Sequence, residues 1–326
     1  MSLYPHISGH LSEVERLMRE HVEKEDPRIY GMLGPFIKRG GKRIRPALCI
    51  LCCSASGGRP EDAIEPASII ELFHNFTLIH DDIEDSSQFR RGEPTLHITH
   101  GVPMALNSGD ALYTLLWKKL LELRMPPSRL ISLQKLYADA FKKVVDGQGV
   151  ELAWIRSKRF DVSEAEYLEM IAGKTSALMG LSCEAGAMMA GSGKRVRTAL
   201  REYGELIGSA FQIQDDVLNL TGDFDKYKKE IGGDVTEGKR TLMVVHALSR
   251  SKDGPRLREI ISSHTGDKSQ IMEAISIMKE AGSIDHARET ARKMVATAKK
   301  KAASLGESAD RESLIAIADY VISREK

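Results

Sequence analysis

Residues 69–85 read IIELFHNFTLIHDDIED, an apolar run that ends in a cluster of acids. A second segment of this kind, AFQIQDDVLN, occupies residues 210–219. On an α-helix, oxygens at positions i, i+1 and i+4 lie within an arc of about 100°, so each segment directs three oxygen ligands to one side. Buried like charges need cations, and Mg²⁺ takes carboxylates together with substrate phosphates. The two segments therefore predict buried helices that end at a site for divalent cations and phosphate.

Helical counting selects the candidate ligands within each acidic segment. Glu84 points away from the other acids of the first segment and is a poor ligand. One face of the first helix carries Glu71, His74, Asp81, Asp82 and Asp85, and one face of the second carries Gln212, Asp215, Asp216 and Asn219. A lone pair of aspartates is usually a solvated salt-bridge partner, but two matched segments in one chain make that interpretation unlikely.

Length and composition narrow the class of protein. The chain has 326 residues, with 47 basic and 46 acidic side chains and a net charge of +1, which argues against a broad nucleic-acid-binding face. No stretch resembles a linker, so we expect a single domain over residues 1–326. There is no signal peptide and no apolar run of the ~20 residues that span a bilayer. The four cysteines read as reduced core thiols, which predicts a cytoplasmic protein.

Helical periodicity dominates the chain, and strand-like alternation is almost absent. The strongest helical patterns cover residues 63–79, 130–145, 167–189, 197–220 and 269–305. We therefore expect an all-α, many-helix architecture. A loop rich in glycine and lysine, residues 222–241, follows the second acidic segment and has the composition of a lid over an anion.

Two basic segments supply candidate anion contacts. GGKRIRP, residues 40–46, is a glycine turn that presents Lys42 and Arg45 at a helix start. Lysine and arginine suit a phosphate held without metal, although a surface basic turn explains the segment equally well. Arg90 and Arg91 follow the first acidic segment, where they can bind two anions, neutralise the neighbouring acids, or do both.

Six strings carry a resemblance to a known family. LIHDDIEDSSQFRRGEPTLH (78–97), GGKRIRP (40–46), NSGDALY (107–113), GKTSALMG (173–180), FQIQDDVLNLTGD (211–223) and EIGGDVTEGKRT (230–241) resemble trans-isoprenyl diphosphate synthases in order and spacing. The resemblance covers nearly the whole chain. It implies the all-α isoprenoid synthase fold around a deep central cavity, usually as a homodimer. It also implies Mg²⁺-dependent, head-to-tail transfer of an allylic diphosphate to isopentenyl diphosphate.

The resemblance assigns roles residue by residue. Asp81, Asp82, Asp85, Asp215 and Asp216 are similar to the aspartates that hold several Mg²⁺ ions on the allylic diphosphate, with Asn219 where many members have Asp. The family's direct contacts to this diphosphate are resembled by four basic residues of this chain: Arg90, Lys174, Lys229 and Lys239. The residues that form the family's metal-free pocket for isopentenyl diphosphate are resembled by Gly41, Lys42, Arg45, His74 and Arg91. Thr175 and Gln212 resemble groups that line the reacting centre. Glu151 stands where the family commonly has Asp, which leaves its role open.

Product length is expected to depend on the residues just before the first motif. An aromatic Phe76 followed by Thr77 resembles the type that makes geranylgeranyl diphosphate, whereas two aromatics would suggest farnesyl diphosphate. Helical counting places Thr77 near the Asp81 face and Phe76 about 140° away, so Phe76 as ordinary core packing remains an alternative.

Three other classes are weaker alternatives. A class I terpene cyclase has a similar first motif but needs no isopentenyl site. A metal phosphohydrolase could be read into His74, His80 and Asp81, but this leaves the second acidic segment and GGKRIRP unexplained. An inactive regulatory subunit should have lost some of the aspartates or arginines, and none is lost.

Overall fold

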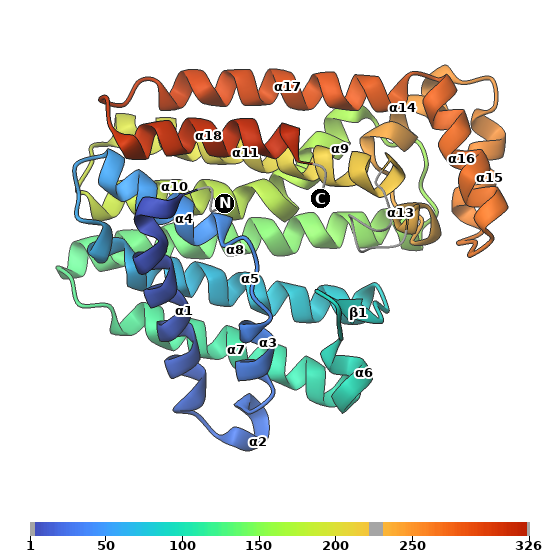
Figure 1. Ribbon diagram of the computed structural model, residues 1–326. Coiled ribbons are helices and arrows are strands. Elements are labelled where there is room, and N and C mark those ends of the chain that lie inside the picture. Colours follow the sequence, from blue (N-terminus) through green and yellow to red (C-terminus); the bar gives the residue numbers. More distant parts are fainter. Residues whose placement is uncertain (1–3, 222–230, 325–326) are drawn as a thin grey trace. The chain divides into compact units, whose positions relative to one another are not determined.

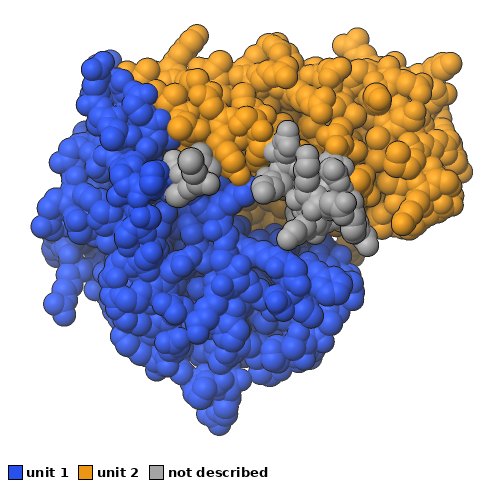
Figure 2. Space-filling view, viewed as in Figure 1, with its two compact units in different colours: residues 1–138, 181–201, 305–314 blue, residues 139–180, 202–304, 315–326 orange. Residues whose placement is uncertain are grey.

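The computed structural model describes residues 4–221 and 231–324, which are almost entirely helical (Figure 1). Two compact units are present, and each is built from three stretches of chain (Figure 2). Unit 1 comprises residues 1–138, 181–201 and 305–314, and unit 2 comprises residues 139–180, 202–304 and 315–326. The single domain expected over 1–326 stays a prediction.

Unit 1 contains most of the N-terminal half. In chain order its complete elements are a 3₁₀ turn (Pro5–Ile7), α1 (Ser8–Glu23), α2 (Pro27–Tyr30), α3 (Leu33–Lys38), α4 (Ile44–Ala55), a 3₁₀ turn (Pro60–Ala63), α5 (Ile64–Glu84), β1 (Phe89–Arg90), β2 (Glu93–Pro94), α6 (Leu96–His100) and α7 (Val102–Glu122). Helix α5 packs against α1, α4 and α7. The five consecutive residues 69–73 are all buried, so α5 is covered on all sides, as expected for a central helix.

Unit 2 contains most of the C-terminal half. Its complete elements are α9 (Glu164–Ile171), a π-helical segment (Ala172–Ser176), α13 (Gly233–Thr236), α14 (Leu242–Arg250), α15 (Gly254–Ser262), α16 (Lys268–Glu280) and α17 (Ser283–Ala302). Four helices have residues in both units: α8 (Pro127–Arg156), α10 (Ala177–Met189), α11 (Lys194–Thr221) and α18 (Ala309–Ser323). Helix α14 packs against α9, α15, α16 and α17.

The predicted helices are confirmed with two corrections. The pattern over 269–305 predicts one helix, but the chain breaks at Gly282, whose φ of 68° is in the left-handed region that glycine adopts without strain. The pattern over 167–189 predicts one regular helix, and the structure inserts the π-helical segment 172–176. The predicted lid, 222–241, lies partly outside the described residues, and its described end forms α13.

Two further expectations concern the cysteines and membranes. Cys49, Cys52, Cys53 and Cys183 are free and buried, so the interpretation as core thiols is confirmed. Within residues 4–221 and 231–324, no helix combines the length and the apolar character needed to cross a bilayer.

Candidate active site

The first aspartate motif forms the last turn of the buried helix α5. Asp82 is 1% exposed, whereas Asp81 and Asp85 are half-buried and Glu84 is exposed, as helical counting predicts for a poor ligand. Burial raises the pKa of Asp82 above its ordinary value, and the nearby Arg90 opposes that shift. One oxygen of Asp82, Oδ2, is buried without a hydrogen-bond partner among the described residues. An orphaned carboxylate oxygen of this kind fits a cation.

The two arginines after this motif have different partners. They lie on a hairpin of β1 and β2 whose turn residues, Arg91 and Gly92, have φ values of 56° and 82°. Arg90 Nε donates to Asp82 Oδ1 at 2.8 Å, so the acid-neutralising interpretation holds for Arg90. Arg91 instead donates to the backbone carbonyl of Gly40. The hairpin therefore joins the first motif to the GGKRIRP segment.

The GGKRIRP segment runs into the start of α4. It is held in place by Arg43, which is not among the functional residues predicted from the sequence. Arg43 lies in the left-handed region at the N-cap, and its buried guanidinium bonds to Glu71 Oε1 at 2.9 Å and to Glu15 Oε1 at 2.7 Å. Glu71 is therefore a structural counter-ion and not a cation ligand. Gly41 packs against the Arg91 guanidinium, because a Cβ there would lie 3.0 Å from Nη2. Lys42 remains exposed, and its carbonyl accepts from Tyr4 Oη.

His74 lies in a strongly cationic environment within unit 1. Its pKa is well below its ordinary value because of burial and of the nearby Arg45, Arg91, Arg90 and Arg43. The imidazole is therefore neutral at pH 7. Burial also lowers the pKa of Arg45, whose guanidinium still stays charged, and its Nε has no hydrogen-bond partner among the described residues. Together these residues make a cationic cluster suited to an anion held without metal.

The second aspartate motif lines a pocket of about 80 Å³ in unit 2. Asp216, 6% exposed, accepts from Tyr167 Oη and from Gln212 Nε2, both at 2.8 Å. Thr175 Oγ1 donates to Gln212 Oε1 at 2.7 Å, so a continuous chain of hydrogen bonds connects the two expected reacting-centre residues to Asp216. Burial, reinforced by Asp234, holds the pKa of Asp216 well above its ordinary value. Such an acid gains from a cation that pairs with its ionised form.

The other two candidate ligands of this motif already have protein partners. Asp215 Oδ1 lies 3.0 Å from a guanidinium nitrogen of Arg324, which is buried near the C-terminus. Asn219 Oδ1 accepts from the backbone N–H of Asp234 at 3.1 Å, and this bond fixes the start of α13. The amide therefore has a structural role, and its role as a metal ligand stays a prediction.

The pocket also contains the two described lysines expected to bind diphosphate. Lys174 pairs with the buried Glu151, and Lys239 pairs with Glu237 and lies 3.6 Å from Asp234. Burial alone would raise the pKa of Glu151, but Lys174 and Lys239 outweigh it and lower the pKa. Glu151 is thus the counter-ion of these lysines. Lys229 lies outside the described residues.

Lys174 and Thr175 owe their position to the π-helical segment. A Cβ on Gly147 of α8 would lie 2.3 Å from the backbone nitrogen of Lys174, and one on Gly173 would lie 2.8 Å from the Lys143 carbonyl oxygen. Two glycines therefore allow α8 and the π segment to approach at backbone contact. Short π segments inside helices often occur at functional sites.

The aspartates do not form preassembled metal cages. Within the described residues, neither motif presents three acidic side chains whose ligand atoms all lie within 4.8 Å of one another. Asp82, Asp215 and Asp216 are instead occupied by Arg90, Arg324 and the Tyr167–Gln212 pair. The donor set of carboxylates beside lysines and arginines still fits a hard cation that shares its coordination sphere with phosphate.

Comparison with known proteins places the chain in a family. A model of the polyprenyl synthetase family matches residues 26–278. A short chain isoprenyl diphosphate synthase of Methanothermobacter thermautotrophicus is 39% identical, over 97% of this chain and all of the relative. A geranylfarnesyl diphosphate synthase of Natronomonas pharaonis is 32% identical over 99% of each chain. A solved structure, geranylgeranyl pyrophosphate synthetase from Pyrococcus horikoshii, superimposes with a TM-score of 0.91 at 35% identity, covering 99% of this chain and 98% of that one.

The chain therefore belongs to the polyprenyl synthetase family. The predicted all-α isoprenoid synthase fold and the class of trans-prenyltransferase are confirmed. The family is generally metal-dependent and uses isoprenoid diphosphates as substrates.

A substitution of Tyr167 tests whether its hydrogen bond to Asp216 orients the Asp216 carboxylate for cation binding. Tyr167→Phe removes one donor and keeps the ring, so we expect the Mg²⁺ concentration for half-maximal prenyl transfer to rise about 10- to 100-fold, as for other second-layer partners of metal ligands. Tyr137→Phe is the matched control, because Tyr137 Oη donates at 2.8 Å to the Pro66 carbonyl in unit 1. This control should lose about 1 kcal/mol of stability and keep its Mg²⁺ dependence. An unchanged Mg²⁺ dependence in Tyr167→Phe would contradict the role.

Proposed function

We propose that this protein condenses isopentenyl diphosphate with allylic diphosphates, head to tail and in the trans configuration, and that geranylgeranyl diphosphate is its main product. The observation that carries the proposal is the cluster of Arg45 and Arg91 near His74, in a chain that also has two aspartate motifs. Terpene cyclases and phosphohydrolases need no second, metal-free anion site. A transferase that joins two diphosphate substrates does.

The proposed mechanism separates the two diphosphates. Gly41, Lys42, Arg45, His74 and Arg91 would hold the diphosphate that stays on the isopentenyl group. Arg90, Lys174 and Lys239 would bind the departing diphosphate more strongly as charge develops on it, and this lowers the barrier to ionisation. Asp81, Asp82, Asp85, Asp215 and Asp216 would hold Mg²⁺, which would supply Lewis-acid stabilisation of the same charge.

The allylic cation must meet the isopentenyl double bond before it meets water. Thr175 and Gln212 offer oxygen dipoles at this point and are fixed to each other by a 2.7 Å hydrogen bond. Thr175 is also buried, which limits access of water. No side chain in the motifs is an obvious base, so the released diphosphate is proposed to take the final proton.

One assay tests this function. The protein is incubated with Mg²⁺, labelled isopentenyl diphosphate and dimethylallyl, geranyl or farnesyl diphosphate, and the dephosphorylated products are sized. We expect twenty-carbon products from all three primers. Absence of condensation with every primer would refute the proposal; cyclic hydrocarbons would indicate a cyclase, and simple release of phosphate would indicate a phosphohydrolase.

Product length is proposed to depend on Phe76 and Thr77. The Phe76 ring packs among Phe73, His80 and Tyr113, with centroid distances of 5.5, 4.6 and 5.0 Å, so it belongs to an aromatic cluster between α5 and α7. Phe76→Ala is expected to lengthen the products beyond twenty carbons, and Thr77→Phe to shorten them towards farnesyl. Phe36→Leu, a change at a fully buried ring elsewhere in unit 1, controls for general loosening of the core. An unchanged product spectrum in both variants would show that Phe76 is ordinary core packing.

A homodimer is also proposed. Ile98 of α6 and Val102, Leu106 and Leu121 of α7 are between 44% and 62% exposed, an unusual density of apolar side chains for a solvated face. Light scattering should give twice the 36.1 kDa mass of the chain. Leu106→Glu should reduce this mass to that of one chain, whereas Met272→Glu, at a still more exposed apolar site in unit 2, should not. A single-chain mass for the unmodified protein would contradict the proposal.

A further inference from the structure

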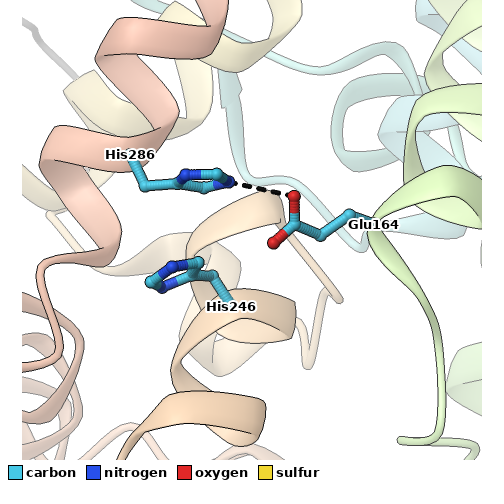
Figure 3. Close-up of side chains that lie close together, drawn as sticks. All are labelled: Glu164, His246 and His286. Atoms are coloured by element: carbon cyan, nitrogen blue, oxygen red, sulfur yellow. Dashed lines mark hydrogen bonds and ion pairs between the residues drawn. The ribbon is translucent and has the colours of Figure 1, made fainter.

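Unit 2 contains a second cluster of metal-ligating side chains that the prenyltransferase chemistry does not use. Glu164 is the first residue of α9, His246 lies on α14, and His286 lies in the first turn of α17. One ligand atom from each residue, a carboxylate oxygen or a ring nitrogen, lies within 4.8 Å of the other two (Figure 3). Among the described residues, no other group of three acidic, histidine or cysteine side chains meets this condition.

The two imidazoles of the cluster stack on each other. Their centroids are 4.3 Å apart and their planes differ by 21°, so two protonated rings would place like charges face to face. Burial, together with His286, lowers the pKa of His246. The other charged groups that act on His246 are Glu164, which opposes this shift, and Arg250, which adds to it. Neutral imidazole is the form that binds metal ions.

The hydrogen bonds around the cluster resemble those that orient metal ligands. His246 Nδ1 lies 2.9 Å from Ser283 Oγ, and in the tautomer that donates from Nδ1 to this hydroxyl the lone pair of Nε2 remains for a ligand. His286 Nε2 lies 2.9 Å from Glu164 Oε2, and the Glu164 carboxylate faces that ring (Figure 3). Ligand atoms on a tetrahedral zinc ion lie roughly 3.4 Å apart, given bond lengths near 2.1 Å. The Glu164 side chain is 42% exposed, so it has room to rotate towards this spacing.

We propose that Glu164, His246 and His286 form a binding site for a divalent transition-metal ion of the zinc type. Two imidazoles and one carboxylate are borderline ligands that suit Zn²⁺, Co²⁺ or Ni²⁺, whereas Mg²⁺ prefers a set of oxygens. The site is thus chemically distinct from the aspartate motifs. Water completes the coordination sphere, because three protein ligands leave a fourth position open.

The site joins three helices, two of which adjoin the pocket of the second aspartate motif. Helix α9 carries Tyr167, the donor to Asp216, and α14 begins directly after Thr241, which lines the same pocket. An ion that binds the folded chain and not the unfolded one stabilises the folded state by mass action. A bound ion therefore stiffens the scaffold of the pocket and takes no part in prenyl transfer.

The test uses the full chain without a histidine tag, stripped of transition metals and kept in excess Mg²⁺ so that the oxygen sites are occupied. Co²⁺ is titrated while visible absorption is recorded, and Zn²⁺ is then added to displace it. We expect a saturable ligand-field band at one Co²⁺ per chain, its loss on addition of Zn²⁺, and a rise in melting temperature with Zn²⁺. In ¹⁵N-histidine spectra, two of the ten histidines should shift.

Variants assign the band to the cluster. His246→Gln and His286→Gln should each weaken Zn²⁺ binding by at least about 10-fold, and Glu164→Gln tests the same site without removing an imidazole. His10→Gln is the matched control, since His10 pairs with Glu61 at 3.2 Å on unit 1 but belongs to no group of three such ligands within the part of the chain that the structure describes. Equal Zn²⁺ affinity in the unmodified protein and the cluster variants, or no Co²⁺ band at one equivalent, would show that His286 and Glu164 form an ordinary ion pair.

A misfolded variant is recognised by its melting temperature without metal, and the Co²⁺ band and the histidine spectra of the unmodified chain decide the question without any variant. Prenyl transfer is measured separately in Mg²⁺. The three cluster variants should retain it within about 2-fold, so failure of the metal site and failure of the proposed function are distinguishable.

Discussion

The burial of carboxylates at the ends of covered helices is the constraint on which the rest of the structure depends. Asp82 and Asp216 are 1% and 6% exposed, and burial raises the pKa of each. An ionised carboxylate in such a place is costly unless it is paired and hydrogen-bonded. Each acid accordingly has its own partner, Arg90 in unit 1 and the Tyr167 and Gln212 donors in unit 2. Because each acid is also poised to gain from added positive charge, the folded chain is stable without substrate and still favours cations.

The same logic explains why so many basic side chains already have partners. Lys174 is paired with Glu151, Lys239 with Glu237, and Arg324 with Asp215. A buried cation held by one carboxylate is desolvated in advance, so a diphosphate that replaces this partner does not have to strip water from it. Arg45 differs, since its buried Nε has no hydrogen-bond partner among the described residues. An anion at that place gains a donor that nothing else satisfies.

The sequence predicted the local elements and the motifs because these depend on spacing along the chain. The apolar run before Asp81 is long enough to identify a covered helix, and α5 is such a helix.

The hydrogen bonds between residues far apart in the chain could not be predicted in this way. Tyr167 and Asp216 are 49 residues apart, Arg324 and Phe211 are 113 apart, and neither Tyr167 nor Arg324 lies in a motif. Glu71 shares a helix face with the aspartates, yet its carboxylate accepts a hydrogen bond from Arg43, whose backbone lies in the left-handed region. The helix break at Gly282 could have been predicted from the sequence, since a lone glycine inside a long helical pattern often ends the helix.

Helix α9 shows how a short element can position both an aspartate of the second motif and a lysine of the same pocket. It has only eight residues, too few to be stable alone, and it continues directly into the π segment with Lys174 and Thr175. Its start is fixed by a capping box in which Ser163 and Glu166 exchange hydrogen bonds, and these bonds with Arg159 lower the pKa of Glu166 to about 2. The π segment that follows it is fixed by the glycine contacts with α8.

Between these two fixed ends, a displacement of α9 by about 1 Å would break the 2.8 Å hydrogen bond from Tyr167 to Asp216 and disturb Lys174 at the same time. Positional accuracy at the second aspartate motif is therefore imposed from outside the motif, by a helix that the motif itself does not contain.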